Sequence, residues 1–177
     1  MKTIIAATLT LMFATTLIAQ SKPAKPRFSS VYSNFTTDCK SWAGEGGTDG
    51  YSICRGPGRY QIRNYFAAAA AIYNAELRGD DGQGYPLTMV ALDFDDRKTK
   101  VEWRMANGNP FAVIMRIPTY AAPTKDTDYW GPVNGAKLII RGLKGFDIDE
   151  EVDAKLPDSN ARAREIADAA YRRIKGT

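Results

Sequence analysis

The sequence predicts an α+β fold in which a curved antiparallel sheet, or a partly open barrel, packs against a C-terminal helix. Apolar and polar residues alternate along several short segments, most clearly over residues 100–117, as they do in half-buried strands. Near the end of the chain, over residues 163–174, apolar residues recur instead at helical spacing. The sequence shows no internal repeat, so we expect one domain over residues 28–177.

Residues 1–19 have the pattern of a secretory signal peptide. Lys2 gives a positive start, an uncharged apolar or hydroxylic run follows, and Ala19 offers a small residue at a cleavage site. The alternative is an uncleaved anchor, but the run is shorter than the about 20 residues that a membrane span needs. Residues 20–27, rich in Pro and Lys, read as a flexible leader. We therefore expect a periplasmic or secreted protein that is not an integral membrane protein after cleavage.

The first predicted strands are short and joined by turns. Alternation predicts strands over residues 29–35 and 59–66 and a short extended piece over residues 51–54. The five alanines at residues 67–71 favour a helix by propensity, but they lack an N-cap and have aromatic neighbours. We predict two strands joined at or through these alanines. Residues 87–94 fit either a strand or a short helix.

Cys39 and Cys54 are the only cysteines of the chain. Export favours their oxidation, so we predict a disulfide. It would close a loop that contains the glycine-rich residues 43–50, which would be loose without a covalent link. The alternative is a redox-active or metal-binding pair. The spacing is not that of a CxxC motif, and the chain has no histidine to complete a metal site.

Residues 100–117 predict a β-hairpin whose register follows from its faces. A two-residue turn would set Trp103 opposite an even-numbered residue, whereas an odd loop at residues 107–109 sets it opposite Val113. We choose the odd loop because it places the apolar residues of both strands on one buried face. That face consists of Val101, Trp103, Met105, Phe111, Val113 and Met115.

The other face of the hairpin is charged. It carries Glu102, Arg104 and Arg116, with Glu102 diagonal to Arg116 in a predicted cross-strand ion pair. Beyond the hairpin, residues 118–135 contain no convincing element, and such long loops are often functional. Residues 136–142 read as a strand. The mixed, acidic segment over residues 146–156 is predicted to be a short strand or a loop.

Asp158 or Ser159 can cap the final helix, and Gly176 can end it. Its apolar stripe consists of Ala163, Ile166, Ala167, Ala170, Tyr171 and Ile174. The basic residues of the last turns are Arg172, Arg173 and Lys175. The helix dipole favours positive charge at this end, which explains them without a binding role.

Composition excludes several classes of chemistry. The absence of histidine removes His-based triads, His-containing metal sites and imidazole acid–base catalysis. Asp93, Asp95 and Asp96 lie close together but lack the glycine and glutamate of a calcium loop, and no phosphate-binding glycine motif is present. We predict no metal and no cofactor. With 24 basic and 20 acidic residues, the net charge of +4 is too small for a nucleic-acid footprint.

The candidate binding residues are aromatic residues in predicted loops. Trp42 lies in the cysteine loop, and Tyr120, Tyr129 and Trp130 lie in the long loop that follows the hairpin. Loop aromatics are common anchors of a protein or glycan contact, although they could also cover the edge of a sheet. We predict a non-enzymatic accessory or binding protein that contacts an envelope protein or glycan. One version is an inhibitor of an envelope-directed hydrolase.

The alternative function is a carboxylate-dependent hydrolase acting on an envelope polymer. Without histidine, two carboxyl groups would have to carry the chemistry. Glu102 is the best single candidate because it lies on a strand near arginines, a placement that equally fits an ion-paired or solvent-facing residue. An enzyme would bring two acids together in a pocket, whereas a binding protein would present an exposed aromatic patch.

Five parts of the sequence resemble a family of small exported bacterial proteins of unknown function. They are Cys39, CRGPGRY at residues 54–60, VEWR at 101–104, GNPFAVIMR at 108–116 and NARAREIAD at 160–168. The resemblance covers nearly the whole chain after residue 19. It implies a periplasmic or secreted single domain with one disulfide, and it supplies no activity or catalytic residue. Many relatives carry further cysteines near the end, which this chain lacks.

Overall fold

The computed structural model describes residues 25–34, 37–43, 49–79, 81–91, 99–125 and 129–176. Three predictions fall outside these residues: the signal peptide over residues 1–19, residues 20–24 of the leader, and the cluster of Asp93, Asp95 and Asp96. The described elements follow one another as strands β1 to β10 and then helix α1 (Ser159–Lys175).

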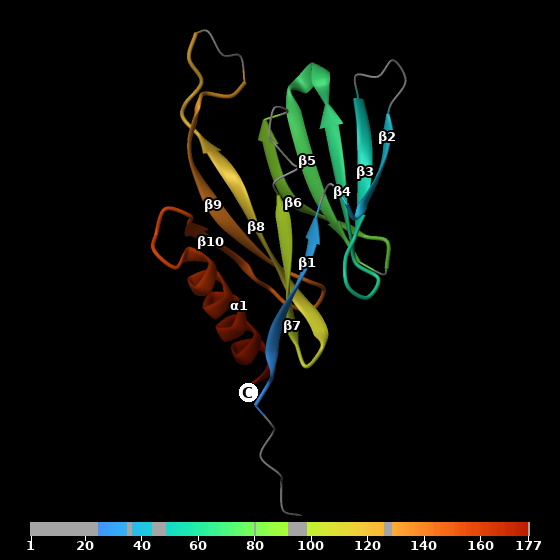
Figure 1. Ribbon diagram of the computed structural model, residues 1–177, viewed down its shortest axis with the longest axis vertical. Helices are drawn as coiled ribbons and strands as arrows, with labels where there is room; N and C mark the ends of the chain where they lie inside the picture. Colours follow the sequence, from blue (N-terminus) through green and yellow to red (C-terminus); the bar gives the residue numbers. More distant parts are fainter. Residues whose placement is uncertain are drawn as a thin grey trace, which may run out of the picture.

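The strands form two five-stranded antiparallel sheets (Figure 1). Sheet A has the order β1 (Phe28–Asn34), β7 (Lys100–Ala106), β8 (Asn109–Tyr120), β9 (Val133–Gly142) and β10 (Asp149–Asp153). Sheet B is a meander of β2 (Cys39–Ala43), β3 (Asp49–Arg55), β4 (Gln61–Ala67), β5 (Ile72–Arg78) and β6 (Gly84–Ala91). The predicted α+β class is confirmed, with the strands divided between two sheets that do not close into a barrel.

Sheet A is the central layer of the molecule, between α1 on one side and sheet B on the other (Figure 1). Its residues alternate between two apolar clusters. The cluster toward sheet B includes Val101, Trp103, Val113, Met115, Ile139, Ile62, Ala75 and Leu77. The cluster toward α1 includes Phe111, Ala112, Ile114, Leu138, Ile140, Ala163 and Ala167. Because both faces of sheet A are covered, two charged residues of β7, Glu102 and Arg104, are placed in the interior.

The predicted pairing of Trp103 with Val113 is confirmed, but the turn that produces it differs from the predicted one. Trp103 faces Val113 across β7 and β8. The turn nevertheless has two residues, Asn107 and Gly108, both with positive φ (52° and 81°) as a type I′ turn requires. A β-bulge opposite Arg104 and Met105 adds one residue to β8 and shifts the register back by one.

The same bulge explains one wrong prediction. Phe111 is the extra residue of β8, so it does not join Trp103 on the face toward sheet B. Its ring instead packs on the α1 side, with the centroid 4.9 Å from that of Tyr171 and 5.6 Å from that of Phe146. The other five residues predicted for the buried face do share it.

Most of the other predicted elements are present. The segments predicted at residues 29–35, 51–54, 59–66 and 136–142 correspond to β1, β3, β4 and β9; β6 covers the start of 87–94; and 146–156 contains β10. The alanines form a 3-10 turn at Ala68–Ala70, and Ala71 follows with φ of 50°. The two flanking strands are therefore joined through the alanines, as predicted.

The predicted long loop over residues 118–135 is shorter than expected. β8 continues through Pro118 to Tyr120 and β9 starts at Val133, with Pro118 opposite Ala136. The sequence obscured this extension because proline and glycine interrupt the alternation on both strands. A further register shift near Tyr120 marks the irregular end of the ladder.

The C-terminal helix is confirmed, whereas its predicted side-chain cap is wrong. Asp158 occupies the N-cap position with φ of 56° and makes no side-chain capping hydrogen bond. Gly176 ends the helix in a left-handed conformation, as predicted (φ 67°). Among the basic residues of the last turns, Arg172 lies over the ring of Phe28 and Lys175 over that of Phe146. Within the described ranges, no helix combines the length and apolar character needed to cross a bilayer.

The predicted disulfide is confirmed. Cys39 and Cys54 are direct cross-strand partners on β2 and β3, and their sulfur atoms are bonded. Close to this link, the ring of Trp103 packs directly on Gly56, where a Cβ atom would lie 2.3 Å from the ring. The Trp103 indole donates a hydrogen bond to Ser33 Oγ (2.9 Å), and Ser33 donates to the carbonyl oxygen of Arg55 (2.8 Å). These contacts fix β2 and β3 relative to sheet A.

Candidate functional site

Glu102 and Arg104 lie on the face of β7 that α1 covers, and both are buried. Arg104 donates two hydrogen bonds to the carboxylate of Asp168 on α1, from Nε (2.9 Å) and Nη2 (2.6 Å). Arg164, one turn earlier on α1, donates to Glu102 from Nε (2.6 Å) and Nη2 (3.1 Å). Ser30 on β1 connects the two pairs, because it accepts from Arg104 and donates to Glu102. We call these five residues the buried network.

The buried network corrects the predicted ion pair of Glu102 and shows how its charges are neutralised. The predicted pair of Glu102 with Arg116 is wrong: Arg116 is exposed, and Glu102 binds Arg164 because α1 covers this face. The hydrogen bond that Arg164 donates to Glu102 raises the pKa of Arg164 above its ordinary value, so Arg164 stays charged. Two cations and two anions satisfy one another here, so none of the buried charges is left without a partner.

The buried network also connects strings that carried the family resemblance. VEWR at residues 101–104 supplies Glu102 and Arg104, and NARAREIAD at residues 160–168 supplies Arg164 and Asp168. These two strings are far apart in the sequence and meet at the interface of sheet A with α1. Their charged residues are therefore explained by folding.

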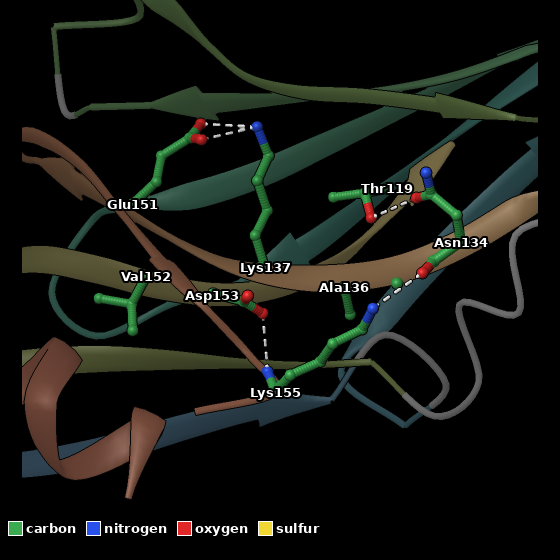
Figure 2. Close-up of a pocket in the computed structure, with 9 residues that line it drawn as sticks. Thr119, Asn134, Ala136, Lys137, Glu151, Val152, Asp153 and Lys155 are labelled. Carbon is green, nitrogen blue, oxygen red and sulfur yellow. Dashed lines mark hydrogen bonds and ion pairs between the residues drawn. The ribbon is translucent and has the colours of Figure 1, made fainter. Parts of the chain in front are cut away.

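A polar hollow of about 350 Å³ lies where β9 and β10 run side by side (Figure 2). The two lysines that line the hollow are bound within the chain. Lys137 Nζ lies 2.7 and 2.8 Å from the carboxylate oxygens of Glu151, and Lys155 Nζ donates to the Asn134 carbonyl oxygen (3.1 Å). Asp153 accepts from the backbone N–H of Lys155. The hydrogen bond from Lys137 holds the pKa of Glu151 below its usual range.

Across the described ranges, no group of three or more His, Cys, Asp or Glu side chains could hold a metal ion. Glu151 and Asp153 are the two carboxylates that line the polar hollow, and both accept hydrogen bonds from neighbouring donors. Glu102, the other carboxylate of interest, is held by Arg164 and Ser30. The carboxylates at these two places are thus bound to donors of the chain itself.

The predicted binding residues of the long loop have different surroundings. Trp130 packs against Tyr120 (ring centroids 4.8 Å apart) and donates a hydrogen bond to the carbonyl oxygen of Ala71 (3.0 Å). Tyr120 Oη accepts from the backbone N–H of Ala91 (3.0 Å). Both rings therefore link sheet A to sheet B. Tyr129 is exposed to 62% and borders, with Trp130, a cleft of about 480 Å³.

Trp42 lies on strand β2, on the face of sheet B that points away from sheet A. Cross-strand pairing places Trp42 beside Tyr51 and Tyr51 beside Tyr65. The rings of Trp42 and Tyr51 are stacked, with centroids 5.0 Å apart and planes 16° from parallel, and Tyr65 follows 6.4 Å beyond Tyr51. We call these three residues the aromatic row. At 42%, Trp42 is its exposed end.

Cationic side chains accompany the aromatic row on the same face. The guanidinium of Arg63 lies over the rings of Tyr51 (4.8 Å) and Tyr65 (4.5 Å). Its Nε is buried without a hydrogen-bond partner. Lys40 and Arg55 share this face by strand alternation. Lys40 is two residues from Trp42 on β2, and Arg55 is two residues from Ile53, the partner of Lys40, on β3.

Trp42 also forms part of a cleft of about 690 Å³ beside the edge of the sandwich. Lys40, Ile53 and Arg55 of sheet B line it, and the opposite wall is β1 of sheet A. The exposed apolar side chains of that wall are Val31 and Tyr32. The cleft thus brings together exposed aromatic, aliphatic and cationic groups from both sheets.

The sequence identified Trp42 but missed its neighbours. Tyr51, Arg63 and Tyr65 belong to segments that the sequence predicts as strands, and the alternation in these segments does not single them out as binding residues. Tyr65 is two residues from Arg63 on the same strand, and the register of β3 against β4 adds Tyr51 beside them. Pairing signals for a meander were present in the turns at residues 56–60 and 68–71, but they do not specify which face carries the aromatic residues.

Fold and site together define an α+β protein of two antiparallel sheets and one helix, with an aromatic and cationic surface on the outer sheet. Comparison of the chain with family models, with curated proteins and with solved structures gives no match. Function must therefore be argued from the surface itself.

Proposed function

We propose that this chain is an exported, non-enzymatic accessory protein that binds a component of the cell envelope through the outer face of sheet B. The N-terminal pattern of residues 1–19 supports export, and the disulfide fits an oxidising compartment. The observation that carries the proposal is the aromatic row ending in the exposed Trp42 beside the cleft.

The aromatic row has the properties of a binding hot spot. Trp, Tyr and Arg are the residue types that dominate the energy of protein contacts, and here Tyr51 stacks on Trp42 and also lies under the guanidinium of Arg63. The disulfide between β2 and β3 holds Trp42 in place before a partner arrives, which lowers the entropy lost on binding. A large aromatic ring left exposed at a rigid edge is well suited to contact a partner.

The surface of the long loop supports the proposal less well. Trp130 and Tyr120 use their polar atoms within the fold, so their rings serve the contact between the sheets. Tyr129 remains an exposed aromatic residue at that end and is retained as a test position.

The test is sedimentation of the purified, disulfide-bonded protein with the insoluble envelope fraction of its source organism. We expect Trp42→Ala to weaken retention at least tenfold, since a hot-spot aromatic residue contributes about 2 kcal/mol or more. Tyr85→Ala is the matched control, because Tyr85 is exposed to 41%, almost the same as Trp42, and lies in another part of the surface.

Three results would contradict the proposal. Retention that is equal for the wild type and Trp42→Ala would exclude the aromatic row. A larger loss for Tyr129→Ala than for Trp42→Ala would assign binding to the long loop instead. Absence of retention of the wild-type protein would exclude an envelope component as the partner. Thermal unfolding of each variant checks that the comparison is made between folded proteins.

A further inference from the structure

We propose that the partner is an acidic polysaccharide, a polymer of sugar rings that bear carboxylates, and that it binds along the aromatic row and the adjoining cleft. This inference rests on the proposed function and specifies the chemical class of its ligand. It is based on the charges that surround the aromatic row.

Three cations of this face have no ion-pair partner among the residues that the structure describes. Over the described residues, Lys40, Arg55 and Arg63 have no ion-pair partner. Glu76 stands opposite Arg63 across β4 and β5, but in the described part of the chain its carboxylate pairs with Arg78 (2.8 Å). An excess of positive charge therefore remains around the aromatic row, and it favours an anionic ligand.

Arg63 is the most informative of these cations. Two tyrosine rings hold its guanidinium in place, and its buried Nε has no hydrogen-bond partner. A guanidinium held in position matches the geometry of a carboxylate and loses little entropy when it binds one.

The cleft adds an exposed ring next to these charges. One face of the Trp42 indole is covered by Tyr51, so its exposed area lies on the other face and the edges. Lys40 is two residues from Trp42 on β2, a distance of about 7 Å along a strand. A sugar ring stacked on Trp42 would thus carry a ring-attached carboxylate within reach of the Lys40 ammonium. Asp38 also lines the cleft, and its carboxylate accepts the backbone N–H of Asn34.

This spacing favours a glycan whose repeating unit contains both ring and charge. An acidic protein surface offers carboxylates without flat apolar rings beside them. A single-stranded nucleic acid does combine rings and charges. The predicted export and the disulfide place the chain in a compartment where polysaccharides are the abundant polyanions, so nucleic acid is treated as an outcome of the test.

The experiment measures binding of the full, disulfide-bonded chain to polygalacturonate by isothermal titration calorimetry. The comparison probe is the same polymer after reduction of its carboxyl groups. We expect at least tenfold tighter binding to the acidic form, and weaker binding as salt is raised. The double variant Lys40→Gln/Arg55→Gln should lose this preference. Arg173→Gln, an exposed cation of α1, is the matched control and should retain it.

The outcomes separate this inference from the proposed function. Equal affinity for the two polymers, or no affinity for either while envelope retention still depends on Trp42, would overturn the acidic polysaccharide and leave the proposed function standing. Tighter binding to an oligothymidylate than to polygalacturonate would also overturn it. Loss of both polymer binding and Trp42-dependent retention would overturn both proposals.

Discussion

The arginines of this protein fall into two different environments. At the interface of sheet A with α1, Arg104 of β7 and Arg164 of α1 are each bound to a carboxylate through two hydrogen bonds. On the outer face of sheet B, Arg63 is stacked on two tyrosines and has no carboxylate partner. Both regions are built on regular antiparallel strands, so local structure does not account for the difference.

The difference shows how pairing separates charges that serve folding from charges that are available to a ligand. A charge enclosed between a sheet and a helix must be neutralised, since burial of an unpaired ion costs several kcal/mol. At the outer face water solvates the exposed part of the guanidinium, and no partner is required. The buried network is therefore expected to determine stability, and the aromatic row with its cations to determine binding.

The largest expected effect comes from breaking the buried network. Asp168→Ala should lower the free energy of unfolding by about 3–5 kcal/mol, because it leaves Arg104 buried without its anion. Chemical denaturation followed by circular dichroism measures this change. A loss below about 0.5 kcal/mol, the level of an ordinary surface substitution, would show that the network is not structural.

A double variant separates the loss of the ion pair from the burial of a single charge. Arg104→Met/Asp168→Leu removes both charges and should recover more than half of the stability lost in Asp168→Ala, because apolar residues can replace a buried pair. If the double variant is as unstable as the single one, the shape of these side chains matters more than their charge.

The second effect, on sheet B, comes from the disulfide. Replacing both Cys39 and Cys54 by alanine should lower the free energy of unfolding by about 3 kcal/mol, as expected for a link across 15 residues. The loss should be accompanied by faster amide hydrogen exchange in β2 than in α1, because only β2 is held at the edge by this bond. Equal acceleration in both elements would contradict the assignment of the disulfide to local anchoring of Trp42.

A smaller effect is expected for Arg63, and it is the sharpest contrast with Asp168. Arg63→Met should change the free energy of unfolding by no more than about 1 kcal/mol, since it removes cation–π contacts but also a buried Nε without a partner. Denaturation next to Asp168→Ala measures the contrast. A loss of about 3 kcal/mol or more would place Arg63 among the structural charges.

The smallest effect concerns the exposed pair of Lys137 and Glu151. The hydrogen bond from Lys137 keeps the pKa of Glu151 below its ordinary value of 4.5, so the pair stabilises the fold above that pH, and its contribution is lost as the pH falls through the lowered pKa. Glu151→Gln should cost at most about 0.5 kcal/mol at neutral pH, because solvent screens the pair. Denaturation at pH 7 and at about pH 3 should show this difference shrinking, and a difference that grows on acidification would contradict it.

Much of the fold was predictable from sequence. The period-two alternation of β7 and β8 reflects a covered face, and the alanine stripe of α1 reflects the close approach of a helix. The disulfide followed from compartment and spacing. The bulge at Phe111 was not predictable, because an inserted residue in a strand has no signature when apolar residues surround it on both sides.

The site was predictable only in part. Trp42 could be identified as an aromatic residue in a glycine-rich neighbourhood, but Tyr120 and Trp130, which the sequence treats alike, serve the contact between sheets. Exposure and hydrogen bonding distinguish these rings, and both depend on what packs nearby.

The sequence by itself determined most of the strands, the helix and the covalent link, because periodicity, turn residues and thiol pairing are local or compositional signals. It placed Trp42 in a loop, whereas the structure has it on β2. Tertiary structure alone decided which arginines are paired. Glu102 finds Arg164 only because α1 folds back over β7. Arg63 lies over Tyr51 because of the register of β3 against β4, whereas Glu76, opposite it on β5, pairs with Arg78. Charge pairing depends on distances between residues far apart in the chain, and folding sets those distances.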